Sequence, residues 1–354
     1  MPHIPMTMKA VVFEEIGRIA VKDHPVPKVG DDEILVKTVA VSLNPTDWMH
    51  VDLTLLVGKP GTVLGCDFSG TVVRVGNNVK SPKVGDHVAG FVHGCQFPDE
   101  GAFAEYVKTP AELVWVVPPK TLTHEQAAAL GCAFWTAAQV FYHPKHLALV
   151  EPPQKAAGDE WIFIYGGSSG VGMSATQLAH LSGYKIVTAA SPRNFPLLKS
   201  LDADEMFDYR DPEIISKIKA VTGDSIKRAL DTIAVKESLR MTAETIWPQG
   251  GKVNVILPPD PEATSRNDVE IDYTSVFTTL GRAYDFGTDT HYPASPEDRA
   301  PMAEFLKKLP KLVRDGAVKP LPVKLWDGGL DTITEGLQYM RDGKVSGEKI
   351  VYKL

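Results

Sequence analysis

Residues 161–190, WIFIYGGSSGVGMSATQLAHLSGYKIVTAA, constrain the fold more strongly than any other part of the chain. An apolar run with the composition of a strand leads into a glycine-rich turn, then a segment of helical composition, then a second apolar run. This order predicts a β-α-β unit, whose two strands run parallel because the helix carries the chain back across the sheet. A glycine-rich turn between the first strand and the helix is typical of a dinucleotide-binding site.

The turn departs from the strict G-x-G-x-x-G pattern. If Gly167 is taken as its first glycine and Gly172 as its third, Ser169 occupies the second position. Glycines still allow the backbone to turn sharply and to approach a pyrophosphate closely, and the helix N-terminus that follows favours an anion. We therefore expect a nucleotide cofactor at this turn, against the alternative of an ordinary strand-to-helix connection.

The loop after the second strand indicates which dinucleotide is bound. An NAD site usually carries an acidic residue about 20 residues beyond the turn, where it binds the ribose 2′-hydroxyl group. Here the loop offers Ser191, Arg193 and Asn194 and no acid. A hydroxyl and a guanidinium suit a 2′-phosphate, so the sequence predicts NADPH. The alternative is that Arg193 is only a solvated loop residue.

The pattern of short strands and helices predicts an α/β chain with two domains. Residues 1–122 are rich in short β-like runs separated by turn residues, which indicates a β-rich, barrel-like domain. Residues 123–284 begin with helical composition and then alternate strand-like and helix-like segments, ending in a strand-like run at 274–281. Such alternation predicts a doubly wound parallel sheet. Residues 285–354 add a Pro-rich loop, an amphipathic helix and a last strand.

Composition excludes several classes of protein. The net charge of -7 argues against nucleic acid or an anionic membrane as the main partner. Cys66, Cys95 and Cys132 are too few for a disulfide framework, which favours a reduced, intracellular chain. We find no signal-peptide pattern and no apolar run of the roughly 20 residues that span a bilayer, so we expect a cytoplasmic protein.

Several motifs resemble those of the medium-chain dehydrogenase/reductase superfamily. They are SLNPTDWMH (42–50), VLGCDFSGTVVRVGNNV (63–79), VGDHVAGF (84–91), GAFAEYV (101–107), AAALGCAFWTAAQ (127–139) and GGSSGVG (166–172). They follow the order of the family and cover nearly the whole chain. The zinc-independent quinone oxidoreductase and enoyl reductase branch is most similar, and residues 183–210 and 343–354 resemble fungal enoyl reductases that act in trans with polyketide synthases.

The resemblance implies a GroES-like catalytic domain, built from both chain ends, and a Rossmann domain. At the positions where zinc-dependent members hold the metal, this chain has Asn44, Cys66 and Cys132. Asparagine is a poor zinc ligand, and two thiolates do not make the three protein ligands of a catalytic site. We therefore expect no metal, and the alternative is that His93 and Cys95 complete a site.

The resemblance also implies the chemistry, which is hydride transfer from NADPH to the β-carbon of an α,β-unsaturated carbonyl or thioester. Negative charge then collects on the carbonyl oxygen, which needs hydrogen-bond donors. The implied catalytic residues are Asn44, Thr136 and, as a proton donor, His50. Met49 replaces a lysine that relatives of the trans-acting group often carry, which weakens the expectation of a carrier-bound substrate.

The residues that the resemblance assigns to binding fall into five groups. They are Thr46, Asp47 and Trp48 near the nicotinamide; Gly167, Ser168, Ser169, Gly170 and Val171 at the pyrophosphate; Ser191, Arg193, Asn194 and Tyr209 at the 2′-phosphate; Ile256, Leu257, Val345 and Ser346 around the nicotinamide ribose; and Phe134, Trp135, Phe141, Phe277 and Gly281 along the substrate channel. The alternatives are that Asp47 only caps a helix, and that Trp48 and Tyr209 only pack.

Two other functions stay open at this stage. One is a quinone or alkenal reductase that acts on free small molecules, and the other is an NADPH-binding protein without catalysis. A polyketide synthase is the expected partner of the trans-acting enzyme. The Pro-rich and charged segment after the strand at 274–281 could cover the sheet edge, so we expect a monomer.

Overall fold

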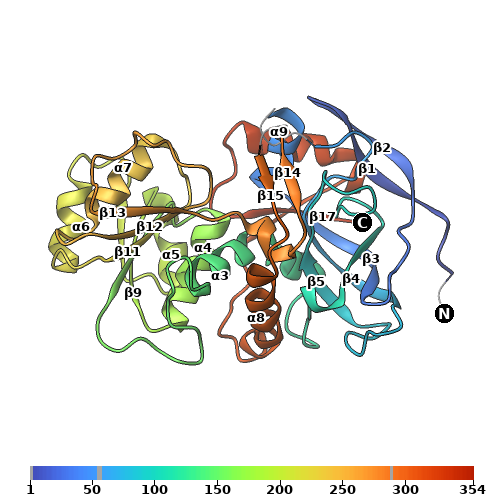
Figure 1. Cartoon of the computed structure of the whole chain (residues 1–354), viewed down its shortest axis with the longest axis horizontal. Coiled ribbons are helices and arrows are strands. Elements are labelled where there is room, and N and C mark those ends of the chain that lie inside the picture. The colour runs from blue at the N-terminus through green and yellow to red at the C-terminus, as the bar shows by residue number, and fades with distance from the viewer. Residues whose placement is uncertain (1–2, 54–57, 288–289) are drawn as a thin grey trace. The chain divides into compact units, whose positions relative to one another are not determined.

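The computed structural model describes residues 3–53, 58–287 and 290–354 and divides the chain into two compact units (Figure 1). The terminal unit combines both ends of the chain, Met1–Cys132 and Phe277–Leu354. The central unit is the middle segment, Ala133–Val276. The boundaries expected from the sequence, after residues 122 and 284, fall about one helical or strand segment away from these.

The terminal unit is built on a seven-stranded sheet. Its strands run in the order β16-β17-β3-β4-β5-β7, and β6 pairs with β3. They are β3 (Glu33–Ser42), β4 (Asp67–Val75), β5 (His87–Phe91), β6 (Tyr106–Pro110), β7 (Val114–Val116), β16 (Val323–Trp326) and β17 (Lys349–Lys353). A separate hairpin joins β1 (Thr7–Glu15) to β2 (Arg18–Pro25). Strand β17 pairs antiparallel with β3, with Val351 opposite Ser42, so the two chain ends share one sheet.

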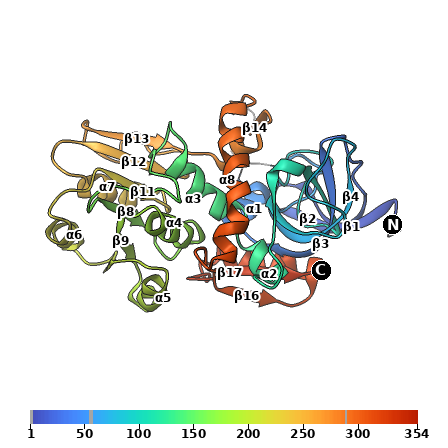
Figure 2. The same ribbon diagram turned by 90° about the horizontal axis from the view of Figure 1, so that it is seen from below.

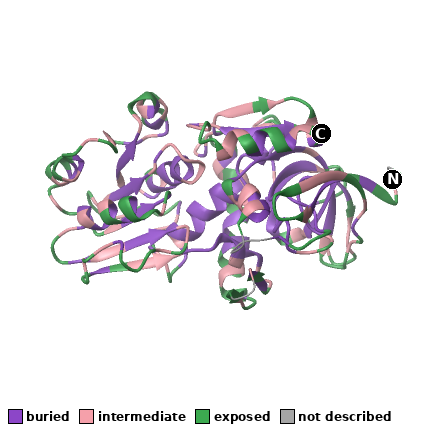
Figure 3. Cartoon of the chain, turned by 90° about the horizontal axis from the view of Figure 1, so that it is seen from above, coloured by how far each residue is buried: buried purple, intermediate pink, exposed green. Residues whose placement is uncertain are grey.

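The core of the terminal unit explains why these segments form strands. Ile34 and Val36 on β3 and Phe68 on β4 are fully buried in one apolar cluster with Val88 and Val107. β-Branched and aromatic side chains of this kind pack well on a pleated surface. Figure 3 shows the inner strands as almost wholly buried. The β-rich domain predicted from the sequence is therefore confirmed.

Two helices of the terminal unit follow strands β3 and β7, and two more lie in the C-terminal segment. They are α1 (Pro45–Asp52), α2 (His124–Ala128), α8 (Pro296–Arg314) and α9 (Ile333–Arg341), with a small hairpin of β14 (Tyr284–Phe286) and β15 (Thr290–Tyr292). Thr123 is the N-cap of α2, and its hydroxyl accepts from the N–H of Gln126.

The helical segment that starts at residue 123 is broken in two. Helix α2 ends at Ala128, and α3 (Cys132–Tyr142) starts after Gly131. A Cβ atom on Gly131 would lie 2.3 Å from Oδ1 of Asp67, so only glycine fits where the chain passes this carboxylate.

The central unit is a six-stranded parallel sheet with strands in the order β10-β9-β8-β11-β12-β13. The strands are β8 (Trp161–Tyr165), β9 (Lys185–Ala190), β10 (Glu205–Asp208), β11 (Arg228–Asp231), β12 (Gly251–Val255) and β13 (Val269–Tyr273). In Figure 2, α4 (Gly170–Leu181) lies on one face of the sheet, and α6 (Ile214–Thr222) and α7 (Lys236–Thr245) lie on the other. This strand order is that of the doubly wound Rossmann fold, which confirms the prediction.

The prediction of a strand at residues 274–281 is wrong. The structure places a 3-10 helix at Val276–Leu280, and the edge of the central sheet is β13, five residues earlier in the chain. Gly281 follows this helix directly, and its φ of +72° lies in the left-handed region that favours glycine.

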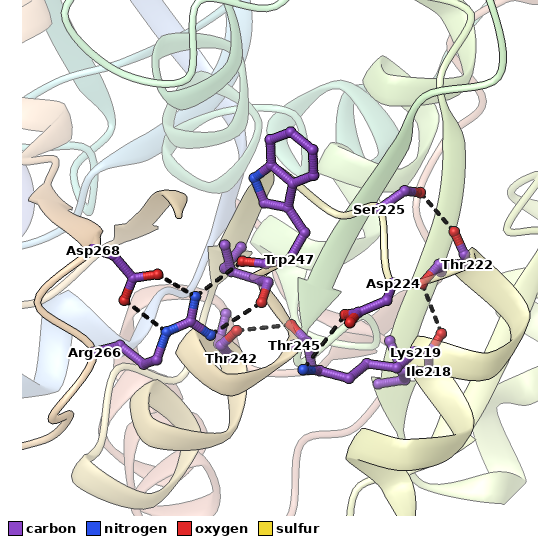
Figure 4. Close-up of polar contacts among 11 residues, drawn as sticks. Ile218, Lys219, Thr222, Asp224, Ser225, Thr242, Thr245, Trp247, Arg266 and Asp268 are labelled. Carbon is purple, nitrogen blue, oxygen red and sulfur yellow. Dashed lines mark hydrogen bonds and ion pairs between the residues drawn. The ribbon is translucent and has the colours of Figure 1, made fainter. Parts of the chain in front are cut away.

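A network of polar contacts joins the end of α7 to the start of β13 (Figure 4). Arg266 donates to the carbonyl oxygens of Ile246 and Trp247 at 3.1 and 2.9 Å, and it forms a two-point ion pair with Asp268. The guanidinium thus bonds the two carbonyl oxygens that follow α7, which fixes the loop before β13 to the end of this helix. Among the described residues, none of the helices is both long and apolar enough to cross a membrane.

Candidate active site

The glycine-rich turn of the central unit is shaped by three close approaches. Gly166 has a φ of +77°. A Cβ atom on Gly167 would lie 2.0 Å from Oγ1 of Thr188, and one on Gly172 would lie 2.3 Å from the carbonyl oxygen of Gly166. The turn therefore has room for backbone only, which is what close approach to a pyrophosphate requires.

Ser169 has a structural role in this turn. Its hydroxyl accepts from the N–H of Gly172 at 2.9 Å, as the N-cap of α4, and donates to Oγ1 of Thr232 at 2.9 Å. The hydroxyl is therefore engaged inside the turn, although the sequence suggested that it donates to phosphate. No hydrogen-bond acceptor for the N–H groups of Gly170 and Val171 lies within the described ranges. These two groups, at the positive end of the helix dipole, fit an anion.

The loop residues expected at the 2′-phosphate follow two neighbouring strands. Ala190 of β9 lies opposite Asp208 of β10, so the segments after both strands start from the same sheet edge. Arg193 is exposed and has neither a hydrogen bond nor an ion pair within the part of the chain that the structure describes. Tyr209 is 40% exposed. The two side chains are thus open to a ligand on this edge.

Sequence reasoning missed Arg210 on the same edge. Its guanidinium contacts both carboxylate oxygens of Asp208 at 2.9 Å and lies 5.5 Å from the Tyr209 ring centroid. The guanidinium compensates the charge of Asp208, an acid that would otherwise repel a phosphate at the end of β10. Asn194 is buried, and Ser191 is half-buried.

In the terminal unit, Asp47 caps the first turn of α1. Its Oδ2 accepts from the backbone N–H of Asn44 at 2.7 Å, so the capping role that the sequence left open is present. Asp47 is only 1% exposed, and burial raises its pKa to about 7. Trp48 packs against the apolar cluster of this unit, as does Val345, and Thr46 is half-buried.

A buried lysine joins the residues that follow β3 to those that start β4. Lys349, at the start of β17, is 5% exposed. Its ammonium donates to the carbonyl oxygen of Leu43 at 2.9 Å, to Oδ1 of Asn44 at 2.6 Å and to Oδ2 of Asp67 at 3.3 Å. Three N–H groups thus meet three acceptors, which is the condition for burying an ammonium at tolerable cost.

Asp67 holds the other side of this network. The carboxylate is fully buried, and its Oδ1 accepts from the backbone N–H of Cys132 at 2.6 Å. Burial raises the pKa of Asp67, and the Lys349 ammonium, the Cys132 N–H and the Asn44 side chain act in the opposite direction. Sequence reasoning missed both residues as parts of the site. A lysine in the apolar strand KIVYK and an aspartate in CDFSG were the available signal, because each needs a partner once buried.

The residues at the zinc-ligand positions do not fit zinc. Asn44 Oδ1 is already bonded to the Lys349 ammonium, a cation that would repel a metal ion. Cys66 and Cys132 are buried, and burial raises the pKa of the Cys66 thiol well above its usual range, which disfavours the thiolate that zinc binds. Within the described ranges, no group of three or more His, Cys, Asp and Glu side chains is placed to hold a metal.

His50 lies in an aromatic cluster with His93. The ring centroids of the two histidines are 5.7 Å apart, and His93 stacks on Phe277 at 3.8 Å. Phe286 is in edge contact with both histidines. Burial lowers the pKa of His50 to about 4 and that of His93 well below its usual value, so both rings are neutral.

This geometry argues against His50 as a proton donor. Its Nδ1 lies 2.6 Å from the carbonyl oxygen of Thr46, which only accepts, so Nδ1 carries the single ring proton. Nε2 is then an unprotonated acceptor, and it is buried without a partner among the described residues. The proton-donor role suggested by the sequence therefore lacks the required proton, and His50 can instead accept a hydrogen bond.

The other predicted substrate and ribose residues fall in both units. Phe134, Trp135 and Phe141 lie on α3 and are fully buried in the central unit, and Thr136 on the same helix is 5% exposed. Ile256 and Leu257 are half-buried after β12. In the terminal unit, Phe277 is buried and Ser346 is half-buried. Gly281 packs closely against the side chain of Arg299.

Comparison with known proteins gives these features a family. Residues 30–119 match the alcohol dehydrogenase GroES-like domain, and residues 170–290 match the zinc-binding dehydrogenase family. The chain is 38% identical over 358 residues to the trans-enoyl reductase ACTTS2 of Alternaria alternata, with 99% of each chain covered. It is 34% identical over 365 residues to the trans-enoyl reductase gkaC of Penicillium citrinum, with 100% of each covered.

A solved structure agrees with the fold. The CurK enoyl reductase superposes with a TM-score of 0.75 at 20% identity, covering 98% of this chain and 99% of that chain. The family matches and the full-length relatives make this chain an oxidoreductase with a nicotinamide cofactor. The chain belongs to the medium-chain dehydrogenase/reductase superfamily, and trans-enoyl reductases are among its full-length relatives.

Proposed function

We propose that this protein is an NADPH-dependent enoyl reductase that reduces the C=C bond of an α,β-unsaturated thioester for a polyketide synthase. The observation that carries the proposal is full-length similarity, at 34–38% identity, to proteins named trans-enoyl reductases. A polyketide intermediate bound to the synthase is the corresponding substrate. The partner is then the synthase itself.

The cofactor preference rests on the edge formed by β9 and β10. Arg193, Ser191 and Tyr209 would surround the 2′-phosphate of NADPH, and the N–H groups of Gly170 and Val171 would face the pyrophosphate. The unpaired guanidinium of Arg193 and the absence of an unpaired acid among these described residues favour NADPH over NADH. When bound, the cofactor supplies the hydride for the β-carbon.

The residues of the terminal unit supply electrostatic help in the proposed reaction. Reduction at the β-carbon places negative charge on the carbonyl oxygen of the thioester, and donors aimed at that oxygen lower the barrier. Asn44 has a buried side-chain N–H₂ group that makes no hydrogen bond of good geometry within the described residues. Asn44 is the donor in this unit that we assign to this oxygen. Because His50 is a neutral acceptor, we assign the proton for the α-carbon to a donor other than His50.

A single assay tests the proposal. NADPH and NADH consumption is followed by the absorbance of the reduced nicotinamide with crotonyl and 2-methylcrotonyl thioesters, a simple quinone, an alkenal and an alcohol/ketone pair. We expect turnover of the thioesters with NADPH at a kcat/KM at least about tenfold above that for the quinone or alkenal. Turnover of quinone or alkenal alone overturns the enoyl reductase, and NADPH binding without turnover of any substrate indicates a non-catalytic protein.

A further inference from the structure

The ammonium of Lys349 lies beside Asn44, the residue that replaces the first zinc ligand of zinc-dependent members. It is bonded at 2.6 Å to Oδ1 of Asn44. It is also bonded to the carbonyl oxygen of Leu43 and to Asp67. Lys349, Asn44 and Asp67 are all buried, with exposed fractions of 5%, 3% and 0% for the whole residues. The contact with the ammonium decides which way the Asn44 amide is turned, because the reversed amide would place N–H₂ against the ammonium.

We propose that Lys349 is a positioning residue, which holds the Asn44 carboxamide with its N–H₂ group free for the developing enolate oxygen and stabilises that charge through the amide. The inference rests on the proposed function, in which negative charge develops on a carbonyl oxygen. It explains how Asn44 can act as a hydrogen-bond donor at a position where zinc-dependent members hold the metal.

Three observations support this role. First, Lys349 has all three N–H groups bonded, so its position is fixed by Leu43, Asn44 and Asp67 rather than by the Asn44 contact alone. Second, the Asn44 backbone is itself fixed, because its N–H donates to Asp47. Third, Nδ2 of Asn44 is buried and makes no hydrogen bond of good geometry in the described part of the chain; the amide lowers the pKa of Asp67, and its second N–H is left for a ligand.

The electrostatic argument follows from hydrogen-bond polarisation. A donor that bonds to an amide oxygen draws electron density toward that oxygen, which makes the amide N–H groups better donors. A full positive charge has the largest effect of this kind, and the buried surroundings weaken it less than water would. Asn44 thus transmits part of the charge of Lys349 to a substrate oxygen that the ammonium itself does not touch.

The test compares wild type with Lys349→Met, Lys349→Arg, Asn44→Ala and the double variant Lys349→Met/Asn44→Ala. We expect Lys349→Met to lower kcat for the enoyl thioester about 10- to 100-fold, which is no more than the effect of removing a donor that contacts an oxyanion directly. The dissociation constant for NADPH, measured by fluorescence, stays within about twofold of wild type. Lys349→Arg keeps the charge and retains kcat within about tenfold of wild type. The double variant is no slower than Asn44→Ala, because Lys349 acts through Asn44.

A second variant distinguishes a direct effect on catalysis from a loss of folding. Lys349→Met leaves Asp67 buried without its cation, whereas Asp67→Asn/Lys349→Met also removes the carboxylate charge and keeps an acceptor for Cys132. We expect this double variant to fold and to show the same loss of kcat. Losses that multiply between Lys349→Met and Asn44→Ala, an unchanged kcat, or a weakened NADPH affinity that accounts for the whole effect would overturn the proposal.

Two further readouts separate this inference from the proposed function. Quinone reduction also places charge on a carbonyl oxygen, so the same comparison is made with a quinone if no thioester is reduced. The ¹⁵N–¹H signals of the Asn44 side chain, assigned by their absence in Asn44→Ala, need no substrate at all. We expect Lys349→Met to shift both N–H₂ signals, and unchanged signals would show that Lys349 does not hold the amide.

Discussion

A Cβ atom on Gly167 would lie 2.0 Å from Oγ1 of Thr188, and that hydroxyl donates to the carbonyl oxygen of Ile164 at 2.7 Å. The glycine-rich turn is therefore packed directly on β9. Thr188 is fully buried, so it cannot move aside without breaking a buried hydrogen bond. The shape of the turn depends on the absence of a side chain at this position.

We predict that Gly167→Ala weakens NADPH binding more than about tenfold and lowers the free energy of unfolding by about 1–3 kcal/mol, the usual cost of overpacking. NADPH fluorescence titration and urea denaturation measure the two effects. Gly167→Ala/Thr188→Ala removes the obstructing hydroxyl and restores part of the affinity. An unchanged dissociation constant in Gly167→Ala would show that the turn does not contact the cofactor.

A second prediction concerns the choice of dinucleotide. We expect Arg193→Ala to raise the dissociation constant for NADPH about 10- to 100-fold and to leave that for NADH unchanged, because in the proposed site the guanidinium would contact only the 2′-phosphate. Arg240→Ala removes an exposed arginine of the same unit and serves as the matched control. Equal weakening of both dinucleotides, or a wild-type preference for NADH, contradicts the assignment of Arg193.

The β-α-β unit and the domain order could be predicted from sequence because their signals are local. The glycine-rich turn, the apolar runs of β8 and β9 and the N-cap Thr123 each lie within a few residues of the element they specify. The same local method failed at residues 274–281, where the apolar composition favours a strand. There, β13 already occupies the edge of the sheet, and the chain forms a 3-10 helix followed by Gly281 with its left-handed backbone.

The Lys349 network could not be predicted in the same way, because it depends on strand pairing across the whole chain. Lys349 meets Asn44 because β17 pairs with β3, although the two residues are 305 positions apart in the sequence. The motif resemblance identified Asn44 but gave no partner for it. Likewise, His50 was a proton-donor candidate until its contact with the Thr46 carbonyl oxygen fixed the position of the ring proton.

A third prediction concerns metal removal. Because the Lys349 ammonium bonds both Asn44 and Asp67, we expect dialysis against 1,10-phenanthroline to leave kcat and the unfolding midpoint unchanged. Metal content measured by mass spectrometry stays below about 0.1 zinc per chain, since fewer than three suitable ligands remain. A loss of activity on dialysis that added zinc restores would contradict this prediction.

A fourth prediction is the pH dependence of stability set by His50. Its pKa in the folded protein is about 4, below the ordinary value of 6.5, so the unfolded chain binds a proton that the folded one does not. The stability that the neutral ring contributes is complete above pH 6.5 and is lost as the pH falls toward 4. For this group alone, the loss amounts to about 3 kcal/mol.

His50→Gln tests this effect in urea denaturation between about pH 4 and pH 8, the range that brackets the folded and unfolded pKa values. The free energy of unfolding of the variant should fall less steeply with decreasing pH than that of wild type, because glutamine does not titrate. His180→Gln changes an exposed histidine and should leave the wild-type slope in place. Parallel curves for wild type and His50→Gln would mean that His50 titrates normally.

The last prediction concerns the stability of the Lys349–Asp67 pair. The two charges are buried together, so removing one leaves the other without compensation, which typically costs about 3–5 kcal/mol. We expect Lys349→Met to lower the free energy of unfolding by about that amount at neutral pH. Asp67→Asn/Lys349→Met should recover most of it, because no buried charge remains and the side-chain amide oxygen introduced at this position would still accept from Cys132. A double-mutant cycle in urea completes the test. The cycle compares the losses of unfolding free energy in Lys349→Met and Asp67→Asn with the loss in the double variant. If the coupling energy does not exceed about 1 kcal/mol, the ammonium and the carboxylate do not form a pair in solution.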